Sequence, residues 1–258
     1  MRITQCHISK SVADFPWLEI YSLDDYRSEK EPCVFFGMYR YEDMRLLVKH
    51  HGAATVFWTG QDVLQEKWRS DKRVFRYRNV TAHPKVAKYL QALGYYCELV
   101  APSSFLNDFW PQPVGTKIYA YCPNNAPDYH GLGVIEELRR GGYEITIGDG
   151  SISQVDWRHK RELFYSDIAI GLCLSSFAGG GTSIIELGLR GVRAVTNVFN
   201  LPHTLAWVDN KDVEQSAVSV ASLIDRERTL VGRTSKNLAK AVYDSLDHTF
   251  EWLGTDEV

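Results

Sequence analysis

The sequence predicts an α/β protein made of two successive domains, each with a parallel sheet flanked by helices. Apolar strand segments alternate with amphipathic helix segments that end at glycines, which is the pattern of strand–helix–strand units. A break with two prolines at residues 107–115 (NDFWPQPVG) separates two such series. We therefore expect residues 1–112 to form one domain and residues 113–258 the other, since 258 residues allow two hydrophobic cores.

The elements of the first domain are predicted from apolar runs and glycine stops. Residues 1–31 are polar and irregular, with a candidate short strand at 17–21. Residues 33–38 (CVFFGM) form an apolar run that is typical of a strand buried on both faces. The next predicted elements are a helix at 41–50, strands at 54–58 and 73–80, a helix at 84–93 closed by Gly94, and a strand at 97–100.

The second domain repeats this pattern. Residues 117–121 predict its first strand, and a helix at 132–140 stops at a glycine pair. The other predicted elements are a strand at 143–147, a helix near 159–165, and closing helices at 213–225 and 235–253.

Residues 167–197 carry the strongest functional signal. An apolar strand at 168–174 is followed by Gly179, Gly180 and Gly181, then by Thr182 and Ser183, which are N-cap types for a helix at 184–190. Gly191 ends that helix, and a strand is expected at 192–196. Glycines before a helix N-terminus let backbone N–H groups approach an anion, which the helix dipole also favours.

Glu186 is a lone acid on the apolar face of this helix, one turn inside it. An acid just beyond a phosphate-binding turn is suited to accept hydrogen bonds from a ribose diol. A structural acid near a helix start is the alternative for Glu186, and a plain tight turn is the alternative for the glycines.

Composition narrows the class of partner and the compartment. A net charge of −3 with interleaved signs gives no basic surface for duplex nucleic acid. Residues 67–78 mix arginines with aromatics, so they form either a solvated amphipathic segment or a contact to an anionic acceptor or peripheral membrane surface.

Five scattered cysteines without a C-x-x-C disfavour a metal cluster and a disulfide framework. With no signal-peptide pattern and no apolar run of transmembrane length, a soluble, cytoplasmic protein is expected.

The second half resembles the GT-B glycosyltransferases, especially the family called group 1. Three motifs carry the resemblance: Ile147-Gly148-Asp149-Gly150 at a strand end, Tyr165-Ser166-Asp167-Ile168 at a strand start, and Gly179-x-Gly181 followed by Glu186 and Gly191. They lie within residues 117–197. The first half, with Phe35-Phe36-Gly37 and residues 58–62 (WTGQD), is similar to a shortened acceptor domain of the same architecture, less specifically.

The resemblance implies two Rossmann-like domains that face a cleft holding a nucleotide sugar, with the last helix crossing back to the first domain. Glu186 matches the acid that binds the ribose hydroxyls. Gly179, Gly181 and Thr182 match the turn and helix start that meet the diphosphate, and residues 148–150 border the nucleoside. The residues expected at the donor are Gly148, Asp149, Gly150, Asn124, Tyr129, Gly179, Gly180, Gly181, Thr182, Ser183 and Glu186. For Asp149, a turn aspartate is the alternative.

Two departures from the family pattern affect the chemistry. Ala178 stands where the family has a second acid near the donor sugar. Residues 122–131 (CPNNAPDYHG) contain no basic residue except His130, although Asn124 and Tyr129 can donate hydrogen bonds to phosphate. The diphosphate would then depend on backbone groups and the helix dipole, or on a basic residue from elsewhere.

Two residues of the first domain are candidates for catalysis. Asp62 follows a strand at its carboxyl end, where parallel-sheet proteins place chemistry. Its alternative role is to cap the following helix. His83 is a candidate general base or phosphate contact, and a plain loop residue before Pro84 is the alternative.

The predicted activity is metal-independent transfer of a sugar from a UDP- or GDP-sugar to a glycan, as in polysaccharide biosynthesis, or to a lipid-linked or protein acceptor, without a cofactor. The sequence contains no D-x-D, no G-x-x-x-x-G-K-[ST] and no G-x-G-x-x-G after the first strand of either domain. A nucleotide-sugar epimerase or hydrolase is one alternative, and an inactive nucleotide-sugar-binding protein is the other. The oligomeric state and the stereochemistry of transfer stay open.

Overall fold

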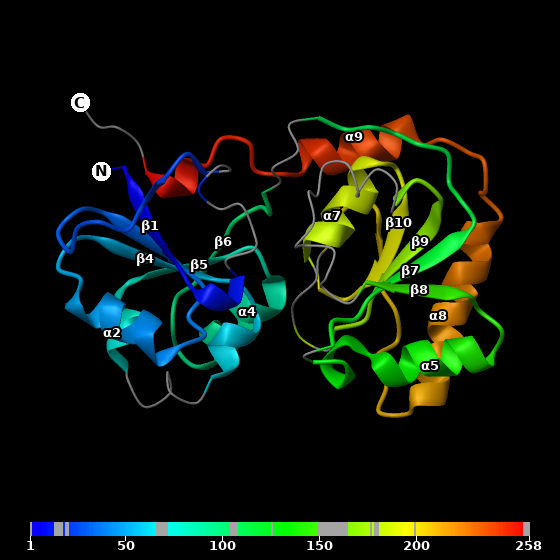
Figure 1. Ribbon diagram of the computed structural model, residues 1–258, viewed down its shortest axis with the longest axis horizontal. Coiled ribbons are helices and arrows are strands. Elements are labelled where there is room, and N and C mark those ends of the chain that lie inside the picture. The colour runs from blue at the N-terminus through cyan, green and yellow to red at the C-terminus, as the bar shows by residue number, and fades with distance from the viewer. Residues whose placement is uncertain are drawn as a thin grey trace. The chain divides into compact units, whose positions relative to one another are not determined.

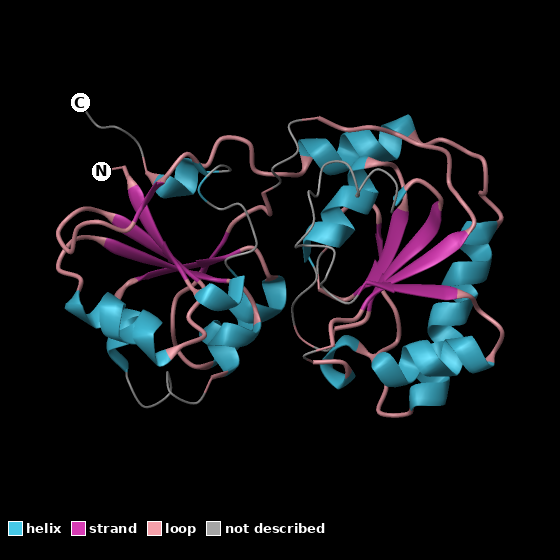
Figure 2. Cartoon of the chain, viewed as in Figure 1, coloured by secondary structure: helices cyan, strands magenta, loops and turns pink. Residues whose placement is uncertain are grey.

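The computed structural model describes residues 2–12, 18, 21–65, 72–103, 108–124, 126–148, 165–175, 177, 181–198 and 200–254. The chain divides into two compact units: unit 1 comprises Met1–Phe105 and Leu246–Val258, and unit 2 comprises Leu106–Ser245. Each unit is built on one parallel sheet with flanking helices (Figure 1; Figure 2). The predicted α/β architecture with two parallel sheets is confirmed. The contacts divide the chain at Leu106, whereas the sequence pattern predicts the change near Pro113.

Six parallel strands form the sheet in the described part of unit 1, in the order β2-β1-β3-β4-β5-β6. Their bounds are Gln5–Ile8 (β1), Asp24–Asp25 (β2), Cys33–Phe36 (β3), Ala54–Trp58 (β4), Arg78–Thr81 (β5) and Glu98–Leu99 (β6). All four residues of β3 are buried, as its apolar run predicts for a strand covered on both faces.

Helices α2 (Tyr41–Lys49) and α4 (Pro84–Ala92) cover one face of this sheet in Figure 1. The shorter 3-10 turns of unit 1 are η1 (Lys10–Val12), η2 (Gln61–Leu64), η3 (Lys72–Arg76) and η6 (Glu251–Leu253). The predicted strand at 73–80 is wrong in its first half, because η3 occupies that segment and buries Val74. The candidate strand at 17–21 lies largely outside the described residues.

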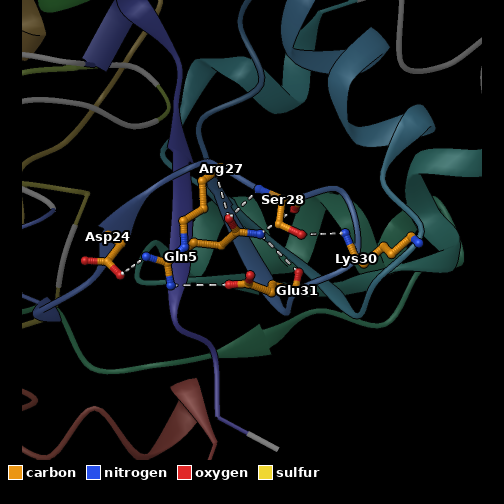
Figure 3. Close-up of polar contacts among 6 residues, drawn as sticks. All are labelled: Gln5, Asp24, Arg27, Ser28, Lys30 and Glu31. Carbon is orange, nitrogen blue, oxygen red and sulfur yellow. Dashed lines mark hydrogen bonds and ion pairs between the residues drawn. The ribbon is translucent and has the colours of Figure 1, made fainter.

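Strand β1 lies in a segment that the sequence predicts to be irregular. It pairs with β3 on one side and β2 on the other. Gln5 is fully buried in β1 because its side chain completes four hydrogen bonds to one loop (Figure 3). Its Nε2 donates to the carbonyls of Ser28 (2.6 Å) and Glu31 (3.2 Å), and its Oε1 accepts from the N–H groups of Arg27 (2.8 Å) and Ser28 (3.0 Å). A polar residue therefore lies inside the sheet without an unsatisfied group.

The end of the chain belongs to unit 1. The predicted helix at 235–253 is too long: α9 spans Lys236–Asp244, and only η6 follows. The Asp247 side chain accepts the N–H groups of Thr249 and Phe250, a local bond pattern that competes with a helix. The Ile3 N–H then donates to the Leu253 carbonyl at 2.9 Å, and Trp252 packs into the same core cluster as Phe36 and Phe57.

Five parallel strands form the sheet in the described part of unit 2, in the order β11-β10-β9-β7-β8. Their bounds are Lys117–Tyr121 (β7), Ile145–Gly148 (β8), Ile168–Cys173 (β9), Arg193–Thr196 (β10) and Thr204–Leu205 (β11). From β7 the chain goes to β8 at one edge and then returns to β9 on the other side of β7. The strand order thus reverses between β7 and β9, which makes this position a topological switch point.

The helices of unit 2 cover both faces of its sheet. Helix α5 (Leu132–Arg140) packs with α8 (Val213–Arg228), while α7 (Gly181–Leu189) packs with α9 on the other face (Figure 1). A 3-10 turn, η4 (Asp128–His130), precedes α5. The structure starts α7 at Gly181, so Thr182 and Ser183 lie in its first turn and the prediction of these residues as N-caps is wrong. The predicted helix near 159–165 lies almost wholly outside the described residues.

Among the described residues, no helix combines the length and the apolar character needed to cross a membrane.

Candidate functional site

The carboxyl ends of β7 and β9 form the switch point of unit 2. Strand β7 ends at Tyr121 and β9 ends at Cys173, and the two strands are adjacent. In open α/β sheets, ligands bind outside the carboxyl ends of the strands at such a point, because the loops from the two strands diverge there. The residues that follow β7 and β9 are therefore the first candidates for a ligand site.

A histidine–serine pair joins these two loops. His130 Nδ1 lies 2.8 Å from Ser175 Oγ, and both residues are buried. Burial lowers the pKa of His130 to about 4, so the imidazole is neutral at pH 7. The rings of Tyr121 and Tyr129 contact it edge-on, with centroid distances of 5.1 and 5.0 Å. The pair supplies hydrogen-bonding groups at the switch point, but no positive charge.

Gly131 brings the β7 loop against the β9 loop. It adopts a left-handed φ of 76°, and a Cβ atom there would lie 2.7 Å from Leu174 Cβ. Both observations require glycine at this position. Helix α5 starts at the next residue, so its N-terminal N–H groups lie at the same carboxyl end of the sheet.

Two of the residues predicted to bind the donor lie close to Tyr119 of β7. Its hydroxyl lies 3.4 Å from Ser183 Oγ in the first turn of α7. A Cβ atom on Gly148, the last residue of β8, would lie 2.4 Å from the same hydroxyl. Burial raises the pKa of Tyr119, and the negative charge of Glu186 acts in the same direction. Glu186 itself is 1% exposed.

The other predicted donor residues fall into two groups. Asn124 is exposed, Tyr129 contacts His130, and Gly181 and Thr182 begin α7. Gly179, Gly180, Asp149 and Gly150 lie outside the described residues, as does Ala178. The structure thus brings Gly148 and Ser183 to the Tyr119 hydroxyl, with Glu186 on the same helix as Ser183, whereas Asn124 has no described contact with them.

Asp62 and His83, the two candidates for catalysis, both lie next to Thr59 in unit 1. The buried Asp62 carboxylate accepts the backbone N–H groups of Met38 (3.1 Å), Thr59 (3.2 Å), Gly60 (2.9 Å) and Val63 (3.1 Å). These bonds hold the loops that follow β3 and β4.

The two side chains also differ in their titration. Burial raises the pKa of Asp62 to about 6, against the effect of its hydrogen bonds. Burial lowers the pKa of His83 to about 4, while a hydrogen bond to the Thr59 backbone acts in the opposite direction. The catalytic roles of both residues stay predictions.

The sequence interpretation missed Tyr119 and Ser175. The alternation in residues 117–121 (KIYAY) could have indicated Tyr119, because it puts the two tyrosines on the face opposite Ile118 and Ala120. Ser175 had no sequence signal of its own, since its role depends on the approach of His130 from another loop. Within the described ranges, no group of three or more His, Cys, Asp or Glu side chains is arranged to hold a metal ion.

Comparisons with known proteins identify the architecture. No protein-family model matches the chain, and no curated protein matches it significantly. Among solved structures, sucrose-phosphate synthase from Thermosynechococcus elongatus aligns over 86% of this chain and 70% of its own, with 13% identity and a TM-score of 0.60. TarM aligns over 89% of this chain and 55% of its own, with 11% identity and a TM-score of 0.55. The fold is of the GT-B type.

A second TarM structure gives the same result for the GT-B fold. It is a point mutant from S. aureus in complex with fondaparinux, alpha-GlcNAc-glycerol and UDP, and it aligns over 83% of this chain with 11% identity and a TM-score of 0.53. The chain spans 52% to 55% of the length of the two TarM structures. At these identities the likeness concerns the fold, and at that level the resemblance predicted from the sequence is confirmed.

Proposed function

We propose that the protein is a glycosyltransferase that moves a sugar from a UDP- or GDP-sugar to a glycan, lipid-linked or protein acceptor. The observation that carries the proposal is the approach of Gly148 and Ser183 to the hydroxyl of Tyr119 in β7. Glu186 lies on the same helix as Ser183. Gly148 and Glu186 come from two separate sequence motifs, and the resemblance assigns both to one nucleotide-sugar donor. Ser183 lies between the glycines and Glu186 of the second of these motifs. The GT-B fold supports the same assignment.

In this proposal, each part of the donor meets a different group of unit 2. Glu186 accepts hydrogen bonds from the ribose hydroxyls. The first turn of α7, with Gly181, Thr182 and Ser183, meets the diphosphate through its N–H groups and dipole. Gly179 and Gly180 contact the diphosphate as well, and Asp149 and Gly150 border the base; these four residues lie outside the described part of the chain.

The departing diphosphate would be stabilised mainly by dipoles. His130, just before α5, and Ser175, just after β9, offer neutral hydrogen-bonding groups, and Asn124 and Tyr129 lie in the same loop as His130. Donors fixed in a folded site need no reorganisation as charge develops on a leaving group, so they stabilise the transition state. This reading agrees with the lack of lysine and arginine in residues 122–131.

A glycan is the acceptor class with the most support. The mutant TarM structure contains UDP together with two sugar compounds, and TarM has the same fold type as this chain. All five cysteines are free thiols, which favours a reducing compartment, and we propose a cytoplasmic enzyme on that basis.

Replacement of Glu186 tests the donor site. We expect Glu186→Gln to weaken the binding of the preferred nucleoside diphosphate about 100-fold, because hydrogen bonds from two hydroxyls to a carboxylate are lost. Isothermal titration calorimetry with UDP and GDP measures this, after a thermal-shift screen with UDP-glucose, UDP-GlcNAc and GDP-mannose has selected the donor. Glu214→Gln, an exposed acid on α8, is the matched control and should bind as the parent does. Equal affinity of parent and Glu186→Gln would rule out the ribose role.

Product analysis separates the proposed activity from its alternatives. A transferase consumes the donor faster when a glycan acceptor is added, whereas an epimerase or hydrolase converts it without one. Donor that binds but stays intact with every acceptor would indicate an inactive binding protein, the alternative suggested by Ala178. Proton NMR of the donor follows all three outcomes.

A further inference from the structure

A tyrosine hydroxyl lies inside a largely apolar cluster of unit 2. Tyr119, the third residue of β7, is 3% exposed and packs in one cluster with Ile168, Leu187 and Val192. A phenylalanine ring would fill the same space, and a buried hydroxyl costs free energy unless it is hydrogen-bonded. The packing of the ring therefore accounts for an aromatic residue at this position, and the partners of the hydroxyl account for tyrosine.

One partner of the Tyr119 hydroxyl lies at the start of α7. The hydroxyl oxygen is 3.4 Å from Ser183 Oγ, and Ser183 is the third residue of α7. Ser183 is half-buried, so its side chain is open to solvent on one side. A strand inside the sheet thus contacts the helix turn that is proposed to meet the diphosphate of the donor.

The protonation of Tyr119 gives this contact a direction. Burial raises the pKa of Tyr119, so the phenol keeps its proton at neutral pH and can donate it to Ser183 Oγ. A serine hydroxyl has one proton to donate and two lone pairs to accept with. When Ser183 accepts from Tyr119, its own proton points to another acceptor. Phosphate oxygens without protons accept only, so they are suited to that place.

Two neighbours fix the position of the Tyr119 hydroxyl. A Cβ atom on Gly148, the last residue of β8, would lie 2.4 Å from the hydroxyl oxygen and 2.6 Å from Cε2 of the ring. The Tyr165 ring meets the Tyr119 ring edge-on, with a centroid distance of 5.7 Å and an interplanar angle of 90°. Because Tyr119 is buried among these groups, its ring cannot move aside without repacking the cluster.

Tyr143 provides a contrast in the same unit. Its hydroxyl donates to Asp225 Oδ1 of α8 at 2.9 Å, and this contact is exposed. The bond is shorter than the one at Tyr119, but it joins none of the residues proposed to bind the donor. A tyrosine hydroxyl that only links two elements of unit 2 is therefore available for comparison.

We propose that Tyr119 is a positioning residue of the donor site, which holds the Ser183 side chain so that the Ser183 hydroxyl donates to a diphosphate oxygen. This inference rests on the proposed glycosyltransferase function, and all of its residues belong to unit 2. Tyr119 acts through Ser183 and does not touch the donor itself. A hydroxyl that is already oriented needs no reorganisation as charge develops on the departing diphosphate.

The experiment is a double-mutant cycle on nucleotide binding. Isothermal titration calorimetry with UDP and GDP compares the parent with Tyr119→Phe, Ser183→Ala and the double variant. We expect each single variant to weaken the binding of the preferred nucleotide about 3- to 10-fold, the usual effect of one neutral hydrogen bond. The double variant should bind no more weakly than Ser183→Ala, because Tyr119 acts through the serine hydroxyl.

Two controls separate positioning from a general loosening of the site. Uridine or guanosine, which has the base and ribose of the preferred nucleotide but no phosphate, should bind equally to the parent and to Tyr119→Phe in an NMR titration. Tyr143→Phe is the matched variant, since it removes a tyrosine hydroxyl from the same unit, and it should keep the parent affinity for the nucleotide.

Each contrary result has a distinct meaning. A parent that binds neither UDP nor GDP overturns the proposed donor site and the role of Tyr119 together. A parent that binds, with either single variant equal to it in affinity, overturns the role of Tyr119 and leaves the donor site standing. The same holds if the two losses add in the double variant, or if Tyr119→Phe weakens the binding of the nucleoside as much as that of the nucleotide.

Discussion

Buried polar side chains hold the loops of unit 1 in place. Gln5 ties the start of β1 to residues 27–31, Asp43 ties its end to the start of α2, and Asp62 joins the loops after β3 and β4. Each side chain has hydrogen-bond partners for its polar atoms. These bonds compensate the free energy that a polar group loses when it leaves water for the core. Which loops these residues join depends on contacts that are distant in sequence.

Asp62 should give unit 1 a pH-dependent stability. Its pKa is about 6 in the folded chain, raised by burial, whereas an unfolded aspartate titrates at about 3.9. Folding therefore favours the protonated form of Asp62. The stability that this protonation adds is present below about pH 4 and is lost as the pH rises through about 6. Between about pH 3.5 and pH 7.5, the stability of the parent relative to Asp62→Asn should fall by roughly 3 kcal/mol.

Urea unfolding at stepped pH, followed by tryptophan fluorescence, measures this difference. If the free energy of unfolding of the parent instead rises relative to that of Asp62→Asn as the pH rises, the four backbone N–H bonds outweigh burial and lower the pKa of Asp62.

The residues of the candidate site were predictable from sequence to different degrees. Glu186, Ser183 and Gly148 were predicted as donor residues because each lies in a local motif with a known physical purpose, and their role stays a prediction. Strand β1 was not recognised, because its polar Gln5 and His7 alternate with Cys6 and Ile8, and a strand of four residues gives little periodicity. In the sequence, Asp43 is indistinguishable from an ordinary acid in the first turn of a helix. Only the folded structure shows that it contacts His7.

At the scale of elements, apolar runs and glycine stops predicted most strands and helices closely. The predictions at 54–58, 117–121 and 132–140 match β4, β7 and α5. Errors arose where side chains compete locally with regular structure, as in the Asp247 turn that follows α9. The two-residue strands β2 and β11 carry no pattern and exist only by pairing with a neighbour.

Trp252 tests whether the C-terminal turn η6 is part of the unit 1 core. Its ring contacts Tyr21, Phe36 and Phe57, with centroid distances of 5.5, 6.4 and 5.3 Å. We expect Trp252→Ala to lower the free energy of unfolding by about 3–5 kcal/mol, because a large buried ring is replaced by a cavity. Equilibrium urea unfolding measures the loss. Tyr96→Ala, at a side chain that is 78% exposed, should change it by less than about 0.5 kcal/mol, and an equally small effect for Trp252→Ala would contradict the packing.

At the scale of the molecule, transfer should not depend on a divalent metal. The sequence has no D-x-D motif, and the proposed site stabilises the diphosphate with helix N-termini and neutral donors. We expect dialysis against EDTA to leave the transfer rate unchanged, as measured by release of the nucleoside diphosphate. A rate that falls and is restored by Mg²⁺ or Mn²⁺ would contradict the metal-independent mechanism.

The sequence by itself determined the α/β class, the two series of parallel strands and the motif around Glu186, because burial of both sheet faces, glycine stops and helix starts are local requirements on residue type. The tertiary structure decided the rest. Strand order placed the switch point between β7 and β9, and brought Ser175 to His130 and Asp43 to His7. These pairs join residues far apart in the chain, and only the packing of strands and helices sets which of them meet.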